Sequence, residues 1–318
     1  TDMAEAITTS GQLSIRWVAD ELNKFLNETV GTDNYDYIVA SDTDSVYVRL
    51  GKLVDRFLPD CDDTNKIVDF LDSSSEKIIQ PLIDKKYDEL AKMMNAYENK
   101  MHMGREVIAE RGIWTAKKRY ALNVWDSEGI RYEEPKLKIM GIETTRSSTP
   151  AIVREKLKNA IRLILTQDEK DIQNYVAEFK EEFFSCEPEE IAFPRGVSNL
   201  EKWESSSEIY ISATPIAVKG SLIYNHYIKK LKLEEKYEKI QQGDKIKFIY
   251  LKEPNPISGM KGDKVISFPA SIPKELDIHR FVDYNMQFTK SFLDPLETIL
   301  NVVGWKSKEE ATLEGLFI

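Results

Sequence analysis

The spacing of apolar residues changes twice along this chain, and each change restricts the folds it can form. Residues 3–29 place apolar side chains mostly three or four positions apart, which predicts a long amphipathic helix ending near Gly31. Ser73 and Glu76 have the spacing of a capping box, which predicts a second helix from there to Met94. From residue 105 to 140 the pattern changes to short strand-like runs, with a turn at residues 126–129. This order predicts an antiparallel sheet with helices on one face.

A second region begins after Gly141, where helical spacing returns. Thr149-Pro150 predicts the start of one helix, and residues 172–183 predict another. Strands are expected at residues 245–251 and 264–268, and a last helix from about Asp277 to Val303. A length of 318 residues suits about two domains. We therefore predict the α+β class, with a sheet domain followed by a mostly helical domain that contains a small β element.

Two carboxylates lie at the tip of an expected hairpin, where Ser41-Asp42-Thr43-Asp44-Ser45 separates two apolar runs. Side chains two positions apart on a strand share a face, so Asp42 and Asp44 could share one cation. Hard divalent ions prefer such oxygen ligands and assist phosphoryl transfer. A solvated acidic turn is the ordinary alternative. A calcium-binding EF-hand loop is excluded, because Tyr47 and Leu53 occupy the positions that need Gly and Glu.

The formal net charge of −10 argues against a polyanionic partner, but the acid is unevenly distributed. Residues 1–72 carry 6 Lys/Arg against 15 Asp/Glu, whereas residues 73–141 carry 13 against 11. Cys61 and Cys186 are far apart and indicate neither a zinc site nor a disulfide framework. No apolar stretch has the length of a membrane span, and no signal-peptide pattern is present at the N-terminus. A soluble protein of a reducing, intracellular compartment is expected.

Two basic clusters follow the acidic hairpin. Lys117-Lys118-Arg119 lies between Trp114 and Tyr120, and cations beside aromatic rings suit phosphates and bases. Lys136 and Lys138 would share one strand face, at a spacing close to one nucleotide step. A solvated basic patch at a strand end is the alternative.

The acidic hairpin, Lys-Lys-Arg-Tyr and Pro-Lys-Leu-Lys-Ile-Met-Gly, in this order, resemble the C-terminal part of family B DNA polymerases of the T-even bacteriophage type. The resemblance extends over essentially the whole chain. It is most specific in residues 6–12, 117–125 and 135–150, and it is weaker at Lys219-Gly220 and Tyr224-Asn225. It implies that residues 1–141 are the C-terminal portion of the palm and residues 142–318 the thumb.

The resemblance also implies a role for each matching residue. Asp44 would bind two Mg²⁺ ions, with Asp42 supporting the site and Glu106 lying beside the metals. Lys118 would contact the primer strand near its 3′ end. Further DNA contacts are expected from the other matching residues, namely Lys117, Arg119, Tyr120, Lys136, Lys138, Arg146 and Lys219. Leu313, Leu316 and Phe317 resemble a tail that docks on a sliding clamp, and a tail folded back on the thumb is the alternative.

Three departures from the family pattern qualify these roles. Ala40-Ser41 stands where the family has Tyr-Gly, and Glu110-Arg111-Gly112-Ile113 is shorter than the glycine-rich loop of the phage enzymes. The family's exonuclease domain, first palm motif and fingers would precede residue 1. We therefore expect an isolated chain to be inactive. It would be either the C-terminal half of a naturally split polymerase or a fragment, and it would polymerise deoxynucleoside triphosphates on primer-template DNA only with a chain that supplies those parts. If phage-encoded, it would act in the host cytoplasm. The alternative is a non-catalytic DNA- and clamp-binding module with a decayed metal site.

Overall fold

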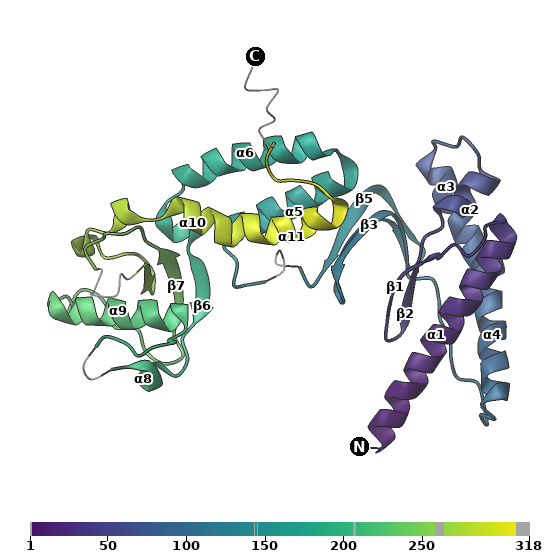
Figure 1. Cartoon of the computed structure of the whole chain (residues 1–318), viewed down its shortest axis with the longest axis horizontal. Helices are drawn as coiled ribbons and strands as arrows, with labels where there is room; N and C mark the ends of the chain where they lie inside the picture. Colours follow the sequence, from purple (N-terminus) through teal and green to yellow (C-terminus); the bar gives the residue numbers. More distant parts are fainter. Residues whose placement is uncertain (1, 143, 145, 206–207, 258–263, 310–318) are drawn as a thin grey trace, which may run out of the picture. The chain divides into compact units, whose positions relative to one another are not determined.

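The computed structural model describes residues 2–142, 144, 146–205, 208–257 and 264–309. The chain divides into two compact units, residues 1–138 and 139–318 (Figure 1). The first unit contains helices and antiparallel strands, and the second is mostly helical with a small sheet. This confirms the predicted α+β class. In the part of the chain that is described, no helix combines the length and the apolar character needed to cross a membrane.

Helices α1 (Asp2–Val30) and α4 (Gln80–Met93) lie side by side in the first unit (Figure 1). The Trp17 indole on α1 donates to the Lys86 carbonyl on α4 at 3.0 Å. Apolar side chains at helical spacing meet between them, and Ile38 and Val48 of the acidic hairpin pack against the same cluster: Val18, Leu22, Ile83 and Tyr87. The long amphipathic helix is thus confirmed, and it supports the hairpin.

The second helix starts earlier than Ser73 predicts. Helix α3 (Thr64–Ser74) continues through a π-helical turn (Ser75–Ile79) into α4, so Ser73 lies inside a helix and caps nothing. The true N-cap is Asp63, whose carboxylate accepts from the Lys66 amide at 3.2 Å. A Ser-x-x-Glu spacing also occurs within helices, so it does not mark a start by itself. The preceding short helix α2 (Gly51–Phe57) was not predicted.

Five strands complete the first unit. β1 (Ile38–Asp42) and β2 (Ser45–Val48) form the predicted antiparallel hairpin. β3 (Val107–Ala116), β4 (Arg119–Ser127) and β5 (Ile130–Met140) form a sheet in that order, and each is longer than the sequence suggests. Glu128 and Gly129 turn the chain between β4 and β5 with φ values of 51° and 85°. Two successive positive φ values suit a tight hairpin, so the predicted turn is confirmed.

Asp126 connects this sheet to α3 through two guanidinium groups. Its side chain is 2% exposed and accepts from Arg105 and from Arg131 Nε, the latter at 3.4 Å. Arg105 also reaches Asp72 Oδ1 at 2.6 Å, and Arg131 reaches Asp69 Oδ1 at 2.9 Å. Asp69 and Asp72 belong to α3, so the network holds the sheet against that helix.

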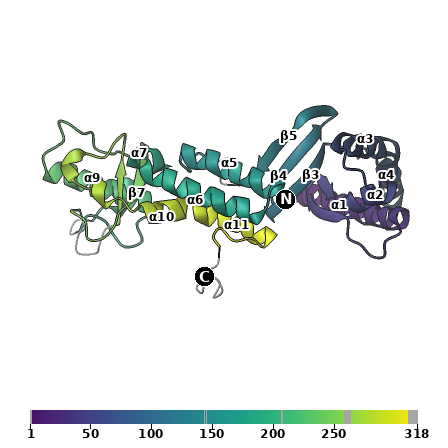
Figure 2. The same cartoon turned by 90° about the horizontal axis from the view of Figure 1, so that it is seen from above.

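The second unit contains a layer of helices (Figure 2). Its members are α5 (Ala151–Thr166), α6 (Glu169–Ser185), α10 (Tyr284–Phe288), a π-helical turn (Thr289–Leu293) and α11 (Asp294–Val303). Its core contains Phe179, Phe183, Phe288 and Phe292, with ring centroids 4.8–5.8 Å apart. The predicted α5 and α6 are confirmed. The last helix begins at Tyr284 rather than near Asp277, because Asp283 caps it by accepting from the Met286 amide at 2.9 Å.

A three-stranded sheet of β6 (Phe193–Gly196), β7 (Lys245–Tyr250) and β8 (Val265–Phe268) forms the rest of this unit, with α9 (Ile216–Lys230) packed on β8. The sequence predicts β7 and β8 but not β6 or α9. The shorter helical segments are α7 (Pro188–Ile191), α8 (Leu200–Trp203), η3 (Lys274–Leu276) and η4 (His279–Phe281). Helix α9 approaches β8 at Gly220, where a Cβ would lie 2.5 Å from Ser267 Oγ and 2.7 Å from its backbone nitrogen.

Replacing Gly220 by Ala should therefore destabilise the second unit, because backbone atoms of β8 cannot move aside without disturbing the sheet. We expect a loss of about 1–3 kcal/mol in the free energy of unfolding, measured by urea denaturation. Gly196→Ala is the matched control, since a Cβ there meets no atom within 4 Å. Equal stability of the two variants would contradict the close-packing interpretation.

Asp126→Asn should destabilise the first unit by about 3 kcal/mol, since it leaves two cations without their shared anion. Burial raises the pKa of Asp126, but Arg105, the Gly129 amide and Arg131 outweigh it and lower the pKa overall. The ion pairs therefore stabilise the fold above the unfolded-state pKa of about 4, and this stability is lost as the pH falls through the lower folded-state pKa.

Urea titrations at neutral and acidic pH test this, with Asp69→Asn as the control because its side chain is 70% exposed. The control should change stability by less than about 1 kcal/mol. If the Asp126→Asn variant loses as much stability on acidification as the native chain does, the pH dependence arises from other groups.

Candidate functional site

The tip of the β1–β2 hairpin brings Asp42 and Asp44 together by a turn. Asp42 ends β1 and pairs with Ser45, and Thr43 and Asp44 form the connection, with φ of Thr43 at 32°. The Asp44 amide donates to the Asp42 carbonyl, and Thr43 Oγ1 donates to Asp42 Oδ1 at 3.1 Å. Asp44 is therefore not a strand residue, and the expectation that strand alternation aligns the two carboxylates is wrong. Asp44 is exposed, whereas Asp42 is partly buried.

The chemistry of this pair suits a hard divalent cation completed by other ligands. Within the described ranges, no three His, Cys, Asp or Glu side chains gather into a metal-binding group. Mg²⁺ typically uses one or two protein carboxylates and takes its remaining ligands from water and substrate phosphates. Asp42 and Asp44 can provide such a partial set. They do not form a closed protein cage.

The turn between β3 and β4 lies against the hairpin tip. Lys117 and Lys118 form this turn, and Lys118 has a φ of 62°. Its Nζ atom lies 3.8 Å from Asp42 Oδ2, and its side chain is 68% exposed. Segments some 70 residues apart in the sequence thus place a cation beside the carboxylate pair.

A second carboxylate and cation meet at the start of β3. Glu106 forms an ion pair with Lys138 of β5. Burial lowers the pKa of Lys138, but the hydrogen bond and the charge of Glu106 outweigh it and raise the pKa overall. Lys136, two residues earlier on β5, lies 4.0 Å from the centroid of the Tyr132 ring. Lys138 therefore remains a cation, and each of the two lysines has a partner within the sheet.

Three aromatic rings join the hairpin to the sheet. Tyr47 of β2 lies 5.2 Å from Trp114 of β3 and 5.4 Å from Tyr120 of β4, measured between ring centroids. Burial, followed by a hydrogen bond with Tyr120 and the charges of Tyr120 and Glu106, raises the pKa of Tyr47. Tyr47 was not predicted as a site residue. Its aromatic type in a short strand gives no sign that it contacts the residues flanking the Lys117-Lys118 turn.

Gly112 makes room for one of these rings. A Cβ at this position would lie 2.7 Å from Trp114 Cζ3 and 2.6 Å from Leu122 Cδ2, so the indole lies over the bare backbone. Residues 110–113, which the sequence suggests are a shortened loop, belong to β3, whose register shifts near Ala109 and Arg111. The strand therefore runs unbroken to the turn that carries Lys118.

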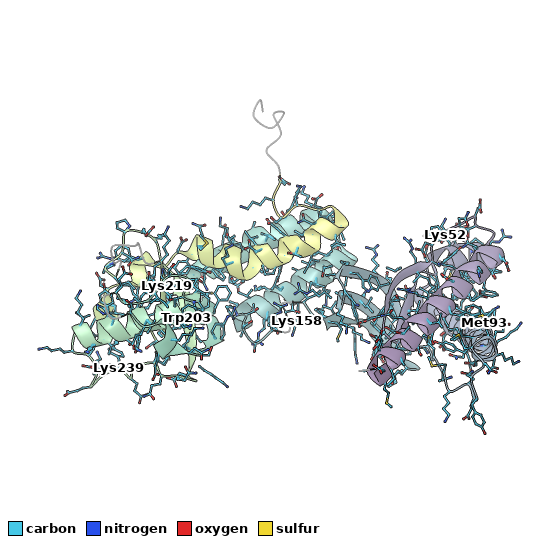
Figure 3. The ribbon with its side chains drawn as sticks, turned by 60° about the horizontal axis from the view of Figure 1, so that its bottom comes forward. Lys52, Met93, Lys158, Trp203, Lys219 and Lys239 are labelled. Carbon is cyan, nitrogen blue, oxygen red and sulfur yellow. The ribbon has the colours of Figure 1, made fainter. Side chains whose placement is uncertain are left out.

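The remaining expected DNA contacts are divided between the two units. Arg119 begins β4 beside Lys118, whereas Arg146 and Lys219 belong to the second unit. Lys219 Nζ lies 4.6 Å from the centroid of the Tyr210 ring, and Figure 3 labels Lys219 on α9 and Trp203 on α8, the short helix that contacts α9. The expected clamp-binding residues lie outside the described residues: Leu313, Leu316 and Phe317.

Comparisons with known proteins identify relatives of this chain. The family described as DNA polymerase family B matches residues 82–302. The DNA-directed DNA polymerase of Enterobacteria phage T4 is 37% identical over 327 aligned positions, which cover 99% of this chain and 35% of the relative. That of Escherichia phage RB69 is 37% identical over 328 positions, with the same coverage. A DNA polymerase of Methanocaldococcus jannaschii is 26% identical over 246 positions, covering 76% of this chain and 13% of the relative.

The chain thus spans about a third of the length of the two phage relatives. The match to the family extends from α4 of the first unit to α11 of the second, so it includes the Glu106–Lys138 pair, the Lys117-Lys118 turn and the close approaches at Gly112 and Gly220. Since it covers more than half of the residues, this chain belongs to DNA polymerase family B.

Proposed function

We propose that this chain provides part of the palm and the thumb of a DNA polymerase, and that it takes part in template-directed nucleotidyl transfer. Residues 1–141 would be the palm portion and residues 142–318 the thumb. The observation that carries the proposal is the distance of 3.8 Å between Lys118 Nζ and Asp42 Oδ2. It places a cation suited to a primer phosphate beside a carboxylate pair suited to Mg²⁺.

In this proposal Asp44 and Asp42 hold Mg²⁺, which would neutralise charge on the reacting phosphates when bound. Lys118 contacts the primer strand near its 3′ end, with Lys117, Arg119 and Tyr120 around that contact. Glu106 holds Lys138 at the edge of the same cluster, and Lys136 and Lys138 grip the duplex backbone upstream. Phosphoryl transfer of this kind requires little covalent chemistry from the protein. These side chains therefore act by positioning the substrates and neutralising charge.

Polymerisation would require the parts of the relatives that this chain does not match. The first palm motif supplies another metal-binding carboxylate in the family resemblance, and the described residues offer no third acidic side chain beside Asp42 and Asp44. We therefore propose that synthesis from deoxynucleoside triphosphates takes place only when this chain is joined to segments carrying the exonuclease, first motif and fingers. Leu313, Leu316 and Phe317 are proposed to dock on a sliding clamp.

Asp44→Ala should abolish primer extension in the enzyme that combines this chain with those segments. We expect a loss of at least about 100- to 1000-fold in rate, because the residue would act on charge that develops during the reaction. Asp33→Ala, a carboxylate before the hairpin, should leave extension unchanged. Extension that survives Asp44→Ala would overturn the proposed metal site. Duplex binding without any synthesis by the native assembly would favour the non-catalytic module.

Lys118→Ala should weaken the use of primer-template DNA. In steady-state extension assays we expect the KM for primer-template to rise about tenfold or more, since one charge-assisted contact contributes about 1.5–3 kcal/mol. Lys100→Ala is the control, because Lys100 is 80% exposed and pairs with nearby Glu98. An unchanged KM for Lys118→Ala would remove this lysine from the primer contact.

A further inference from the structure

Arg195 is a partly buried guanidinium in the small sheet of the second unit. It lies on β6 beside two stacked rings, Phe193 and Phe248, whose centroids are 5.1 Å apart. The guanidinium carbon lies 5.7 Å from the first ring centroid and 5.8 Å from the second. The rings restrict its side chain, so the group is held in one place before any ligand arrives.

The hydrogen bonds of this guanidinium to described residues come from one nitrogen. Nη1 donates to the Ser148 carbonyl at 2.6 Å and to the Pro194 carbonyl at 2.8 Å. Across the described residues, Nη2 and Nε have no protein acceptor, and no carboxylate pairs with the group. Burial lowers the pKa of Arg195, which reflects the cost of removing a cation from water without an anion nearby.

Two partly buried arginines of the first unit, Arg105 and Arg131, provide a comparison. Arg105 is 20% exposed and binds Asp126 and Asp72, and Arg131 is 29% exposed and binds Asp126 and Asp69. Buried cations are ordinarily paired in this way. Among the described residues Arg195 has no such carboxylate, and its printed acceptors there are the two carbonyls that face Nη1.

We propose that Arg195 binds a phosphate of a nucleic-acid backbone through Nη2 and Nε. These two nitrogens form the fork that matches two phosphate oxygens, which a lysine cannot reproduce. The identity of the anion rests on the proposed function, since a DNA polymerase thumb would face a duplex backbone.

The alternative is a purely structural role in which Arg195 anchors Ser148 to β6. The two roles differ in salt dependence, because removing one phosphate-binding cation reduces the slope of log K against log salt by about 0.9. The experiment measures the binding of a labelled DNA duplex to the full chain over a fourfold range of salt concentration. The variants are Arg195→Gln and Arg195→Lys, with thermal unfolding measured for each.

We expect Arg195→Gln to lose about 0.9 of slope, so that its affinity changes about threefold less than that of the native chain over this salt range. Arg195→Lys should keep the slope but bind more weakly, since the charge remains and the fork is absent. Arg280→Gln is the matched control in the same unit, because Arg280 pairs with Asp277 Oδ2 at 2.7 Å and should leave the slope unchanged.

If Arg195→Gln keeps the native slope of log K against log salt but has lower thermal stability, the phosphate contact is overturned and the anchoring role remains. A slope lowered equally by Arg280→Gln would overturn it too, since the effect would then be one of net charge. Failure of the native chain to bind duplex would contradict the proposed function itself and, with it, this contact. Loss of slope confined to Arg195→Gln supports the proposal.

Discussion

The buried carboxylate of Asp126 is the interaction on which the arrangement of the first unit depends. It sits where β4 turns into β5, and through Arg105 and Arg131 it fastens the sheet to α3. The acidic hairpin is fastened separately, by Ile38 and Val48, to the cluster between α1 and α4. Asp42 and Asp44 therefore reach the candidate site from the hairpin that packs on the helices, and Lys118 and Lys138 reach it from the sheet. Any slippage between the two layers would separate them.

The aromatic contact made by Tyr47 supplements that connection close to the chemistry. Tyr47 and Ala40 are cross-strand partners in the hairpin, and Trp114 and Tyr120 flank the Lys117-Lys118 turn. Rings pack in few geometries and make large contact areas, so they fix the hairpin tip against the turn better than the exposed ion pair does. The pair between Lys118 and Asp42 contributes little to stability, because Lys118 is 68% exposed. Because this ion pair is weak, each side chain can take another partner: Asp42 a metal ion and Lys118 a phosphate.

Local signals in the sequence predicted much of this fold. The α1 periodicity, the carboxylate hairpin and the Glu128-Gly129 turn are each set by neighbouring residues, and each was confirmed. The starts of two helices were misplaced, because capping depends on which Asp or Ser side chain turns back on the helix, as Asp63 and Asp283 do. Helix α9 was missed because its buried residues lie at consecutive positions, Gly220 to Tyr224 among them, so its apolar spacing marks no single face.

Only part of the candidate site could be predicted from the sequence. Motif order pointed to Asp42, Asp44 and Lys118, but the contacts of Tyr47, Asp126 and Arg195 join segments distant in sequence, and no local pattern announces them. Some residues within the family resemblance have a structural role, and others do not. Gly220 is required by packing against Ser267, and Asn225 by two hydrogen bonds of 2.8 Å to the Ile240 backbone.

The exposed side chains of Asp44 and Lys118 have no comparable structural role. Lys118 also occupies a left-handed conformation that glycine would adopt more easily. These side chains contribute little to stability, which leaves them available for the metal and phosphate contacts proposed above. The same reasoning applies to Arg195, whose fork lacks the anion that Arg105 and Arg131 receive from Asp126. Lys118 and Arg195, which the fold leaves without a strong carboxylate partner, are therefore well placed to meet a phosphate.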